Sequence, residues 1–286
     1  MNGTRERAHT SRAKVKARFD AVKNIKKSID YFLNNCFNHL MQNLKISFEN
    51  SKLKGIWHYS LPSGYTCPGA SMCKTFCNVN TGKIVDKQTP DANGMTYRCY
   101  AATDEARYPS VRKSRWHNFD LLRGKTQEEM VEVITRSINA SGVRRGGTLR
   151  VHIGGDYFSQ KYFNAWMEAA ASFPQIVFYS YTKSVHFLVN YIRANGALPD
   201  NFVFTCSNGG KYDDQIPFSN VKKASVFFTQ AEADALGLEV DHTDDFAISG
   251  SRDFALLLHG MQPKNTKAGE ALKALKRNGF HGYSAK

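Results

Sequence analysis

Residues 148–156 read TLRVHIGGD, a β-prone run that ends in two glycines and a carboxylate, and Ser159 then signals the start of a helix. The same order returns in IVFYSYTKS at residues 176–184, which precedes helical sequence ending at Asn195 and Gly196. A third strand, NFVFTCSNGG, follows at residues 201–210. Strands that alternate with helices in this way predict a parallel sheet with right-handed crossovers.

The alternation extends in both directions from this segment. Upstream lie GIWHYSLP at residues 55–62 and a helix that begins at the T-x-x-E signal of Thr126 and Glu129. Downstream lie strands at residues 224–229 and 254–260. Five or six strand–helix units in about 230 residues predict an α/β fold, namely a complete or partial (β/α) barrel with an added N-terminal helix. A doubly wound open sheet is the alternative, and both folds place a site at the carboxyl ends of the strands.

The two ends of the chain differ in composition from its centre. Apolar residues recur at helical spacing over residues 12–44 and predict one long amphipathic helix. The last helix, over residues 266–277, is rich in lysine. We therefore expect a basic helical extension at residues 1–50 and one barrel-like domain at residues 51–286 that ends in a basic helix.

The net charge of +14 is concentrated in these ends. Residues 1–27 carry +7 and residues 264–286 carry +5, which leaves +2 for the centre. Such an excess favours a polyanionic partner, most simply nucleic acid or a nucleotide. No apolar run is long enough to span a membrane and the first residues do not form a signal peptide, so we expect a cytoplasmic protein.

Four of the six cysteines, Cys67, Cys73, Cys77 and Cys99, fall within 33 residues with the spacing C-x5-C-x3-C-x21-C. Clustered thiols in a reducing compartment are more often metal ligands than disulfides. The close cysteine pairs of a structural zinc site are absent. A [4Fe–4S] cluster is the favoured interpretation, and zinc or free thiols remain alternatives.

Other polar residues follow the predicted strands. Lys183 is a candidate anion ligand, and Asn208 begins a glycine-containing segment that offers backbone donors. Asp241 and His242 form a candidate acid–base pair. Each of these residues also has an ordinary structural interpretation, as a helix cap or a surface group.

Several motifs together resemble the gene product 88 domain family of phage proteins. They are TCPGASMC, CYAA, VHIGGDYFS, FYSYTKS, FTCSNGGK and FALLLHGMQP. In that family the cysteine loop is compact and ends in Cys-Tyr-Ala, which here occurs only at Cys99. The resemblance implies that residues 78–98 are an insertion, and that Cys77, Cys99 or both bind the metal.

The layout is also similar to radical S-adenosylmethionine enzymes, which are partial (β/α) barrels with a three-cysteine loop after the first strand. Those enzymes end the second strand in a Gly-Gly-Glu-like motif, and here Gly154, Gly155 and Asp156 stand in that place. The resemblance implies that these three residues hold S-adenosylmethionine, with the carboxylate on its ammonium group. The cysteine spacing differs from the usual C-x3-C-x2-C, and Asp replaces Glu.

Two hypotheses follow from these observations. The first is an iron–sulfur protein, a radical S-adenosylmethionine-like enzyme that acts on a nucleotide or nucleic acid. The second is a non-catalytic or hydrolytic nucleic-acid-binding phage protein with a structural zinc or cluster site.

Overall fold

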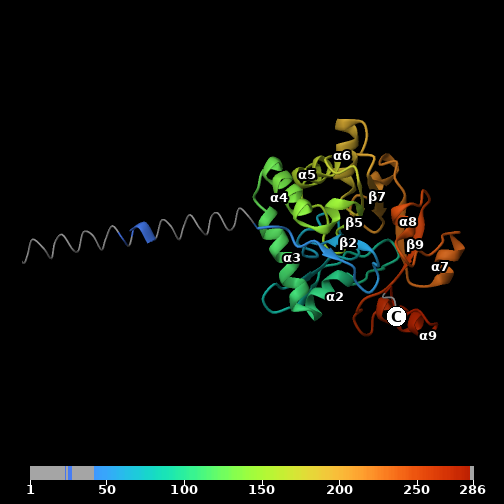
Figure 1. Cartoon of the computed structure of the whole chain (residues 1–286). Coiled ribbons are helices and arrows are strands. Elements are labelled where there is room, and N and C mark those ends of the chain that lie inside the picture. The colour runs from blue at the N-terminus through green and yellow to red at the C-terminus, as the bar shows by residue number, and fades with distance from the viewer. Residues whose placement is uncertain (1–22, 24, 28–41, 284–286) are drawn as a thin grey trace, which may run out of the picture. The chain divides into compact units, whose positions relative to one another are not determined.

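Six parallel strands of the computed structural model lie in the order in which they occur along the chain (Figure 1). A short strand pairs antiparallel with the first of them and completes a seven-stranded sheet. In spatial order the strands are β1 (Ser47–Phe48), β2 (Ile56–Tyr59), β5 (Gly147–Val151), β6 (Ile176–Thr182), β7 (Phe202–Ser207), β8 (Lys223–Phe227) and β9 (Phe254–Leu257). The structure describes residue 23, residues 25–27 and residues 42–283.

This strand order excludes the doubly wound alternative, because a doubly wound sheet reverses its order at a switch point. Every neighbouring pair from β2 to β9 is parallel. Within the described part of the chain β1 and β9 are the two edges of the sheet and do not pair with each other. The sheet is therefore open, and a complete barrel is not confirmed. The fold is mixed α/β with a mostly parallel sheet.

Several helices begin or end at signals that the sequence carries. The Thr126 hydroxyl accepts the Glu129 backbone N–H at 3.3 Å, and the Glu129 carboxylate accepts the Thr126 N–H at 2.7 Å. Ser159 caps its helix in the same manner, at 3.2 Å from the Tyr162 nitrogen. The helices are α2 (Tyr100–Arg107), α3 (Pro109–Leu122), α4 (Gln127–Ala140), α5 (Gln160–Ala171), α6 (Val185–Asn195), α7 (Gln230–Ala235), α8 (Asp245–Ile248) and α9 (Lys267–Arg277), with 3-10 turns at Gly142–Arg145 and Asp213–Phe218.

The two faces of the sheet differ in chemistry because side chains alternate along each strand. Leu149, Val151 and Phe178 point to one face and form the main core with residues of α4, α5 and α6. Figure 1 shows these helices on one side of the sheet, with α2 and α9 on the other. Arg150 and Tyr181 point to the opposite face and line a cavity. The fold therefore places an apolar core on one side of the sheet and a polar hollow on the other.

The N-terminal helix does not reach Leu44 as its apolar spacing predicts. Residues 42–46 have no regular secondary structure. The Leu44 backbone N–H donates to Ser137 Oγ at 2.8 Å, so a side chain of α4 satisfies a donor that a helix would use internally. Of residues 12–41, only residue 23 and residues 25–27 are described, and they are helical.

The chain divides into two compact units, residues 1–42 and residues 43–286. The cavity and the sheet belong entirely to the second unit. No helix among the described residues is long and apolar enough to cross a membrane.

Candidate functional site

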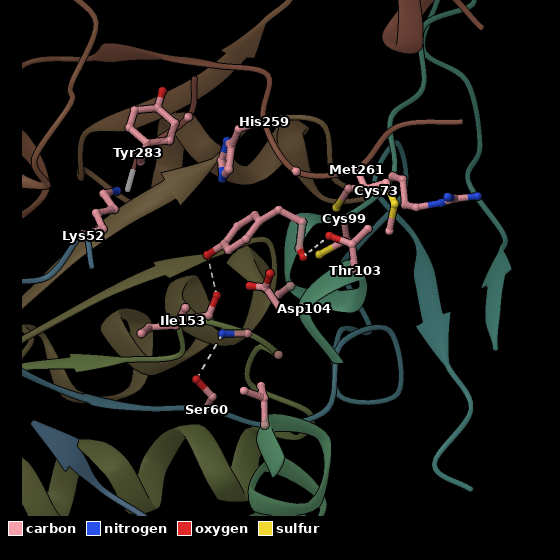
Figure 2. Close-up of a pocket in the computed structure, with 18 of the residues that line it drawn as sticks. Lys52, Ser60, Cys73, Cys99, Thr103, Asp104, Ile153, His259, Met261 and Tyr283 are labelled. Atoms are coloured by element: carbon pink, nitrogen blue, oxygen red, sulfur yellow. Dashed lines mark hydrogen bonds between the residues drawn. The ribbon is translucent and has the colours of Figure 1, made fainter. Parts of the chain in front are cut away.

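The cavity on the polar face of the sheet has a volume of about 1450 Å³. Its walls come from the cysteine loop, from the first turn of α2, from the inner side chains of β5 and β6, and from α9. Ligand pockets typically measure about 300–1000 Å³, so this cavity has room for more than one small molecule. Figure 2 shows Lys52, Cys73, Cys99, Asp104, His259 and Tyr283, from distant parts of the chain, around one hollow.

The lining of the cavity carries more basic than acidic side chains, although two of its arginines, Arg98 and Arg115, form ion pairs with Asp86 and Glu105. Three aspartates, Asp104, Asp156 and Asp244, stand against ten lysines and arginines. These ten are Lys45, Lys52, Arg98, Arg107, Arg115, Arg150, Lys183, Lys264, Lys273 and Lys276. Three of them lie in the C-terminal segment, which folds onto the cavity. In the sequence the positive charge lies at the two ends of the chain. In the folded protein three of the C-terminal lysines line the cavity and contribute to its charge.

Three of the four clustered cysteines line this cavity, namely Cys67, Cys73 and Cys99. Figure 2 shows Cys73 and Cys99 close together at one end of the hollow. Burial raises the pKa of each thiol, to about 12 for Cys99, and nearby thiols raise the pKa of Cys67 and Cys99 further. Lys183 acts in the opposite direction on the pKa of Cys73. Without a metal, these thiols are protonated at neutral pH.

Cys77 lies elsewhere, so the structure does not bring the four predicted ligands together. Its side chain is fully buried on β3 (Thr75–Cys77), where the thiol donates to the Asn78 carbonyl oxygen at 3.8 Å. Its charged neighbours are Glu105 and Arg112, and it does not line the cavity. In the described part of the chain, no group of three or more His, Cys, Asp or Glu side chains is arranged to hold a metal ion.

The path of the chain between Cys77 and Cys99 explains how Cys99 reaches the cysteine loop. Its first half forms a hairpin of β3 and β4 (Ile84–Asp86), which the sequence did not indicate. The chain then returns: the Tyr97 N–H donates to the Met72 carbonyl at 3.1 Å, and the Cys99 N–H donates to Thr75 Oγ1 at 3.1 Å. Residues 78–98 therefore leave the cysteine loop and return to it, which places Cys99 beside Cys73.

Gly154, Gly155 and Asp156 line the cavity, and contacts within the protein account for the two glycines and for the hydrogen bonds of the carboxylate. The Asp156 carboxylate accepts four hydrogen bonds, at 2.7–3.1 Å. A Cβ at Gly154 would lie 2.7 Å from the Arg115 guanidinium, and one at Gly155 would lie 2.6 Å from Leu61 Cβ. The motif thus joins the ends of β5 and β6, and its carboxylate has no capacity left for an ammonium group.

Replacing Gly155 with alanine is expected to destabilise the protein by about 2–5 kcal/mol, since a positive φ costs about 1–2 kcal/mol and an overpacked core about 1–3 kcal/mol. Its φ is +82° and the new methyl group would meet Leu61. Gly237→Ala is the matched control, because Gly237 has a φ of +63° and open space around it. Equal losses in urea denaturation for the two variants would show that Leu61 does not impose the glycine.

Hydrogen bonds from Lys183 to Ser207 and Asn208 connect the carboxyl ends of β6 and β7. The Lys183 ammonium donates to the Ser207 carbonyl at 3.0 Å, to Ser207 Oγ at 2.9 Å and to the Asn208 carbonyl. The backbone N–H groups of Gly209 and Gly210, expected to face an anion, donate to the Asp213 carboxylate at 2.7 and 2.9 Å. Lys183 still lines the cavity, whereas Asn208 does not.

Asp241 and His242 do not line the cavity, and their acid–base role stays a prediction. Asp241 is buried and accepts the N–H groups of Thr243 and Asp244, both at 3.0 Å. His242 is exposed, with its ring 6.1 Å from that of Phe280. The two side chains thus occupy different environments, although they are adjacent in sequence.

An ion-pair cluster that the sequence analysis did not identify lies in the cavity wall. The fully buried carboxylate of Asp244 accepts hydrogen bonds from Lys52, from Arg150 and, at 3.0 Å, from the Tyr179 hydroxyl. One signal was visible, since Arg150 is a charge between Leu149 and Val151 in a predicted strand. No pattern marked Lys52 or Asp244, which lie 192 residues apart.

His259 and Asp104 complete the inner surface of the cavity. The His259 ring lies 4.5 Å from that of Tyr100 and 4.7 Å from that of Tyr283, and burial lowers its pKa to about 4, so it is neutral at pH 7. Figure 2 shows Asp104 between the cysteine end and the Lys52 end of the hollow. Burial raises the pKa of this carboxyl.

The fold and site define a mixed α/β protein with an open sheet and a basic, thiol-lined cavity. The family model described as Gene product 88 matches residues 38–277, and the chain belongs to this family of phage gene products. A search of curated proteins found no match, and a search of solved structures found none either.

Proposed function

We propose that this protein is an iron–sulfur enzyme of the radical S-adenosylmethionine type, acting on a nucleotide or nucleic acid in the cytoplasm of the host cell. The observation that carries the proposal is the position of the thiols. Cys67, Cys73 and Cys99 share one wall of the basic cavity, and Cys77 is absent from its lining.

The donor set suits a [4Fe–4S] cluster. Thiolates are soft ligands, and three of them on the cubane leave one iron open for a cosubstrate. A cluster offers a separate iron to each thiolate, so its ligands do not have to converge on a single ion. Cys67 and Cys73 from the loop and Cys99 from the start of α2 are the residues that would hold it.

The consecutive strand order also favours this class. A partial (β/α) barrel has parallel strands in chain order and an open edge, and its active site lies at the carboxyl ends of the strands. Here the cysteine loop follows β2, the first parallel strand. When bound and reduced, the cluster would supply the electron that cleaves S-adenosylmethionine into methionine and a 5′-deoxyadenosyl radical.

The residues of the chain itself would bind the substrate and exclude water. Ten cationic side chains around the cavity favour a polyanion or a phosphate-bearing molecule. Neutral His259, tilted against Tyr100 and edge-on to Tyr283, adds aromatic surface on which a base could stack. Lys183 holds the ends of β6 and β7 together beside the thiols.

Metal analysis of anaerobically purified protein tests the proposal. We expect a brown protein with about four irons per chain. After reduction it should release 5′-deoxyadenosine from S-adenosylmethionine. A colourless protein that holds one zinc ion, or an iron protein that leaves the cosubstrate intact, would contradict the enzymatic proposal.

The second candidate is a non-catalytic or hydrolytic nucleic-acid-binding protein with a structural zinc or cluster site. The saturated carboxylate of Asp156 favours it, because the motif expected to hold the ammonium group of S-adenosylmethionine is used within the protein. The same basic lining would then bind phosphates without chemistry. Stoichiometric zinc together with salt-dependent binding of single-stranded DNA is the result expected for this candidate.

A further inference from the structure

We propose that the part of the cavity around Arg150 and Lys52 is a binding site for the phosphate group of a nucleotide. The site is separate from the cysteines, and phosphate binding there does not require a metal. Only its role as the anchor of the substrate rests on the proposed function.

The guanidinium of Arg150 has N–H groups without a hydrogen-bond acceptor among the described residues. A guanidinium has five N–H donors, and within the described part of the chain Arg150 uses only some of them, on Asp244 from an Nη atom and on the Tyr179 hydroxyl. Its Nε atom is buried without a partner, and the whole residue is 7% exposed. Buried donors are normally filled, so the remaining N–H groups indicate a ligand with several acceptor oxygens.

Two cationic side chains at this site pair with one carboxylate. Lys52 and Arg150 share the single carboxylate of Asp244, and both cations line the cavity. Among the residues that the structure describes, the other carboxylate that acts on Lys52 is that of Asp241, which does not line the cavity. Burial lowers the pKa of Lys52, and the neighbouring Arg150 lowers it further. A bound dianion would relieve this repulsion between two cations.

Tyr181 supplies a further donor in the same place. Its ring lies 4.9 Å from the Arg150 guanidinium, and its buried hydroxyl has no hydrogen-bond partner among the described residues. Arg, Lys and a tyrosine hydroxyl are the groups that bind phosphate oxygens in proteins. The aromatic ring of Tyr283 lies next to Lys52, whose Nζ is 4.6 Å from the ring centre.

The position of this site relates it to the rest of the cavity. Figure 2 shows Lys52 and Tyr283 at one end of the hollow and Cys73 and Cys99 at the other. A phosphate on Arg150 would therefore direct the remainder of the nucleotide along the cavity toward the thiols. Because Arg150 is nine-tenths buried, we expect a terminal phosphate to reach it more readily than the phosphodiesters of a polymer.

Calorimetric titration of the full-length protein with AMP, adenosine and a single-stranded oligodeoxynucleotide tests this site. We expect AMP to bind more tightly than adenosine by about tenfold or more, because charge-assisted hydrogen bonds to phosphate are strong. Lys52→Met and Tyr181→Phe should weaken AMP binding and leave adenosine binding unchanged. A preference for the oligonucleotide that both substitutions reduce would identify polymer phosphates as the ligand.

Two controls keep the result interpretable. Lys223→Met removes a lysine from an exposed pair with Asp253 (3.4 Å) outside the cavity, and it should not change AMP affinity. Tyr181→Phe removes a hydroxyl without a protein partner, so its thermal stability should equal or exceed that of the original protein. Equal affinities for AMP and adenosine, or AMP binding that survives both substitutions, would overturn the proposal. Because the titration needs no iron, it can succeed where the enzymatic proposal fails.

Discussion

Replacement of Cys99 by alanine is expected to abolish the iron chromophore, with iron content falling from about four atoms to nearly none per chain, because a cubane loses one of its thiolate ligands. Cys67→Ala and Cys73→Ala should have the same effect, since their thiols line the same wall of the cavity. The measurements are the visible absorption spectrum and the iron content of protein purified without oxygen.

Cys77→Ala is the discriminating control. The thiol of Cys77 is fully buried and outside the cavity, next to Glu105 and Arg112, so the variant should keep its iron and lose only a little stability. Cys206→Ala, at another buried thiol, which lies 3.4 Å from Ser219 Oγ, provides a second control. Loss of iron in Cys77→Ala, together with retention in Cys99→Ala, would reverse the ligand assignment that the geometry supports.

Asp244→Asn is expected to lower the free energy of unfolding by about 3–5 kcal/mol, because removing one partner of a buried ion pair leaves uncompensated buried charge. Here two cations, Lys52 and Arg150, would lose their shared carboxylate, and Tyr179 would lose the acceptor of its hydroxyl. Denaturant titration measures the loss. The matched control is Asp253→Asn, because the Lys223–Asp253 pair is exposed and should contribute at most about 1 kcal/mol.

The pH dependence of this contribution follows from the direction of the pKa shift. Although burial opposes ionisation, Arg150 and Lys52 hold the pKa of Asp244 below its usual value. The ion pair therefore stabilises the fold fully above the unfolded pKa of about 4, and this stability is lost as the pH falls through the lower folded pKa. The difference between the original protein and Asp244→Asn should thus be constant near neutral pH and shrink only in acid. A difference that already shrinks between pH 7 and pH 5 would contradict this assignment.

Helix caps, strands and helix ends were predicted correctly where residues close together in the sequence determine them. The capping box of Thr126 and Glu129 spans a single helical turn, and both of its hydrogen bonds are present. The strand at residues 176–184 was recognisable because apolar and β-prone residues are continuous there, as in sheets covered on both faces. Gly196 ends α6 because it adopts a positive φ of 83°, which other residues rarely take.

Local sequence patterns were less informative about which groups would bind a ligand. Gly154 and Gly155 were interpreted as space for a ligand, yet a Cβ at either position would meet Arg115 or Leu61, so packing by itself requires the glycines. The glycines after Asn208 were interpreted as anion donors, yet Asp213 accepts their N–H groups. A sequence displays donors and small residues, but it does not show which protein atoms will meet them.

The amino-acid sequence by itself determined the alternation of strands and helices, the parallel arrangement and the presence of a thiol-rich loop, since periodicity, caps and residue spacing act over a few positions. Only the tertiary structure decided which thiols share a cavity, because the chain from Cys77 to Cys99 leaves the loop and returns. It also decided that the C-terminal lysines line that cavity and that Arg150 meets Asp244, 94 residues away. Contacts of this kind depend on how the sheet and its connections pack, and no local pattern specifies them.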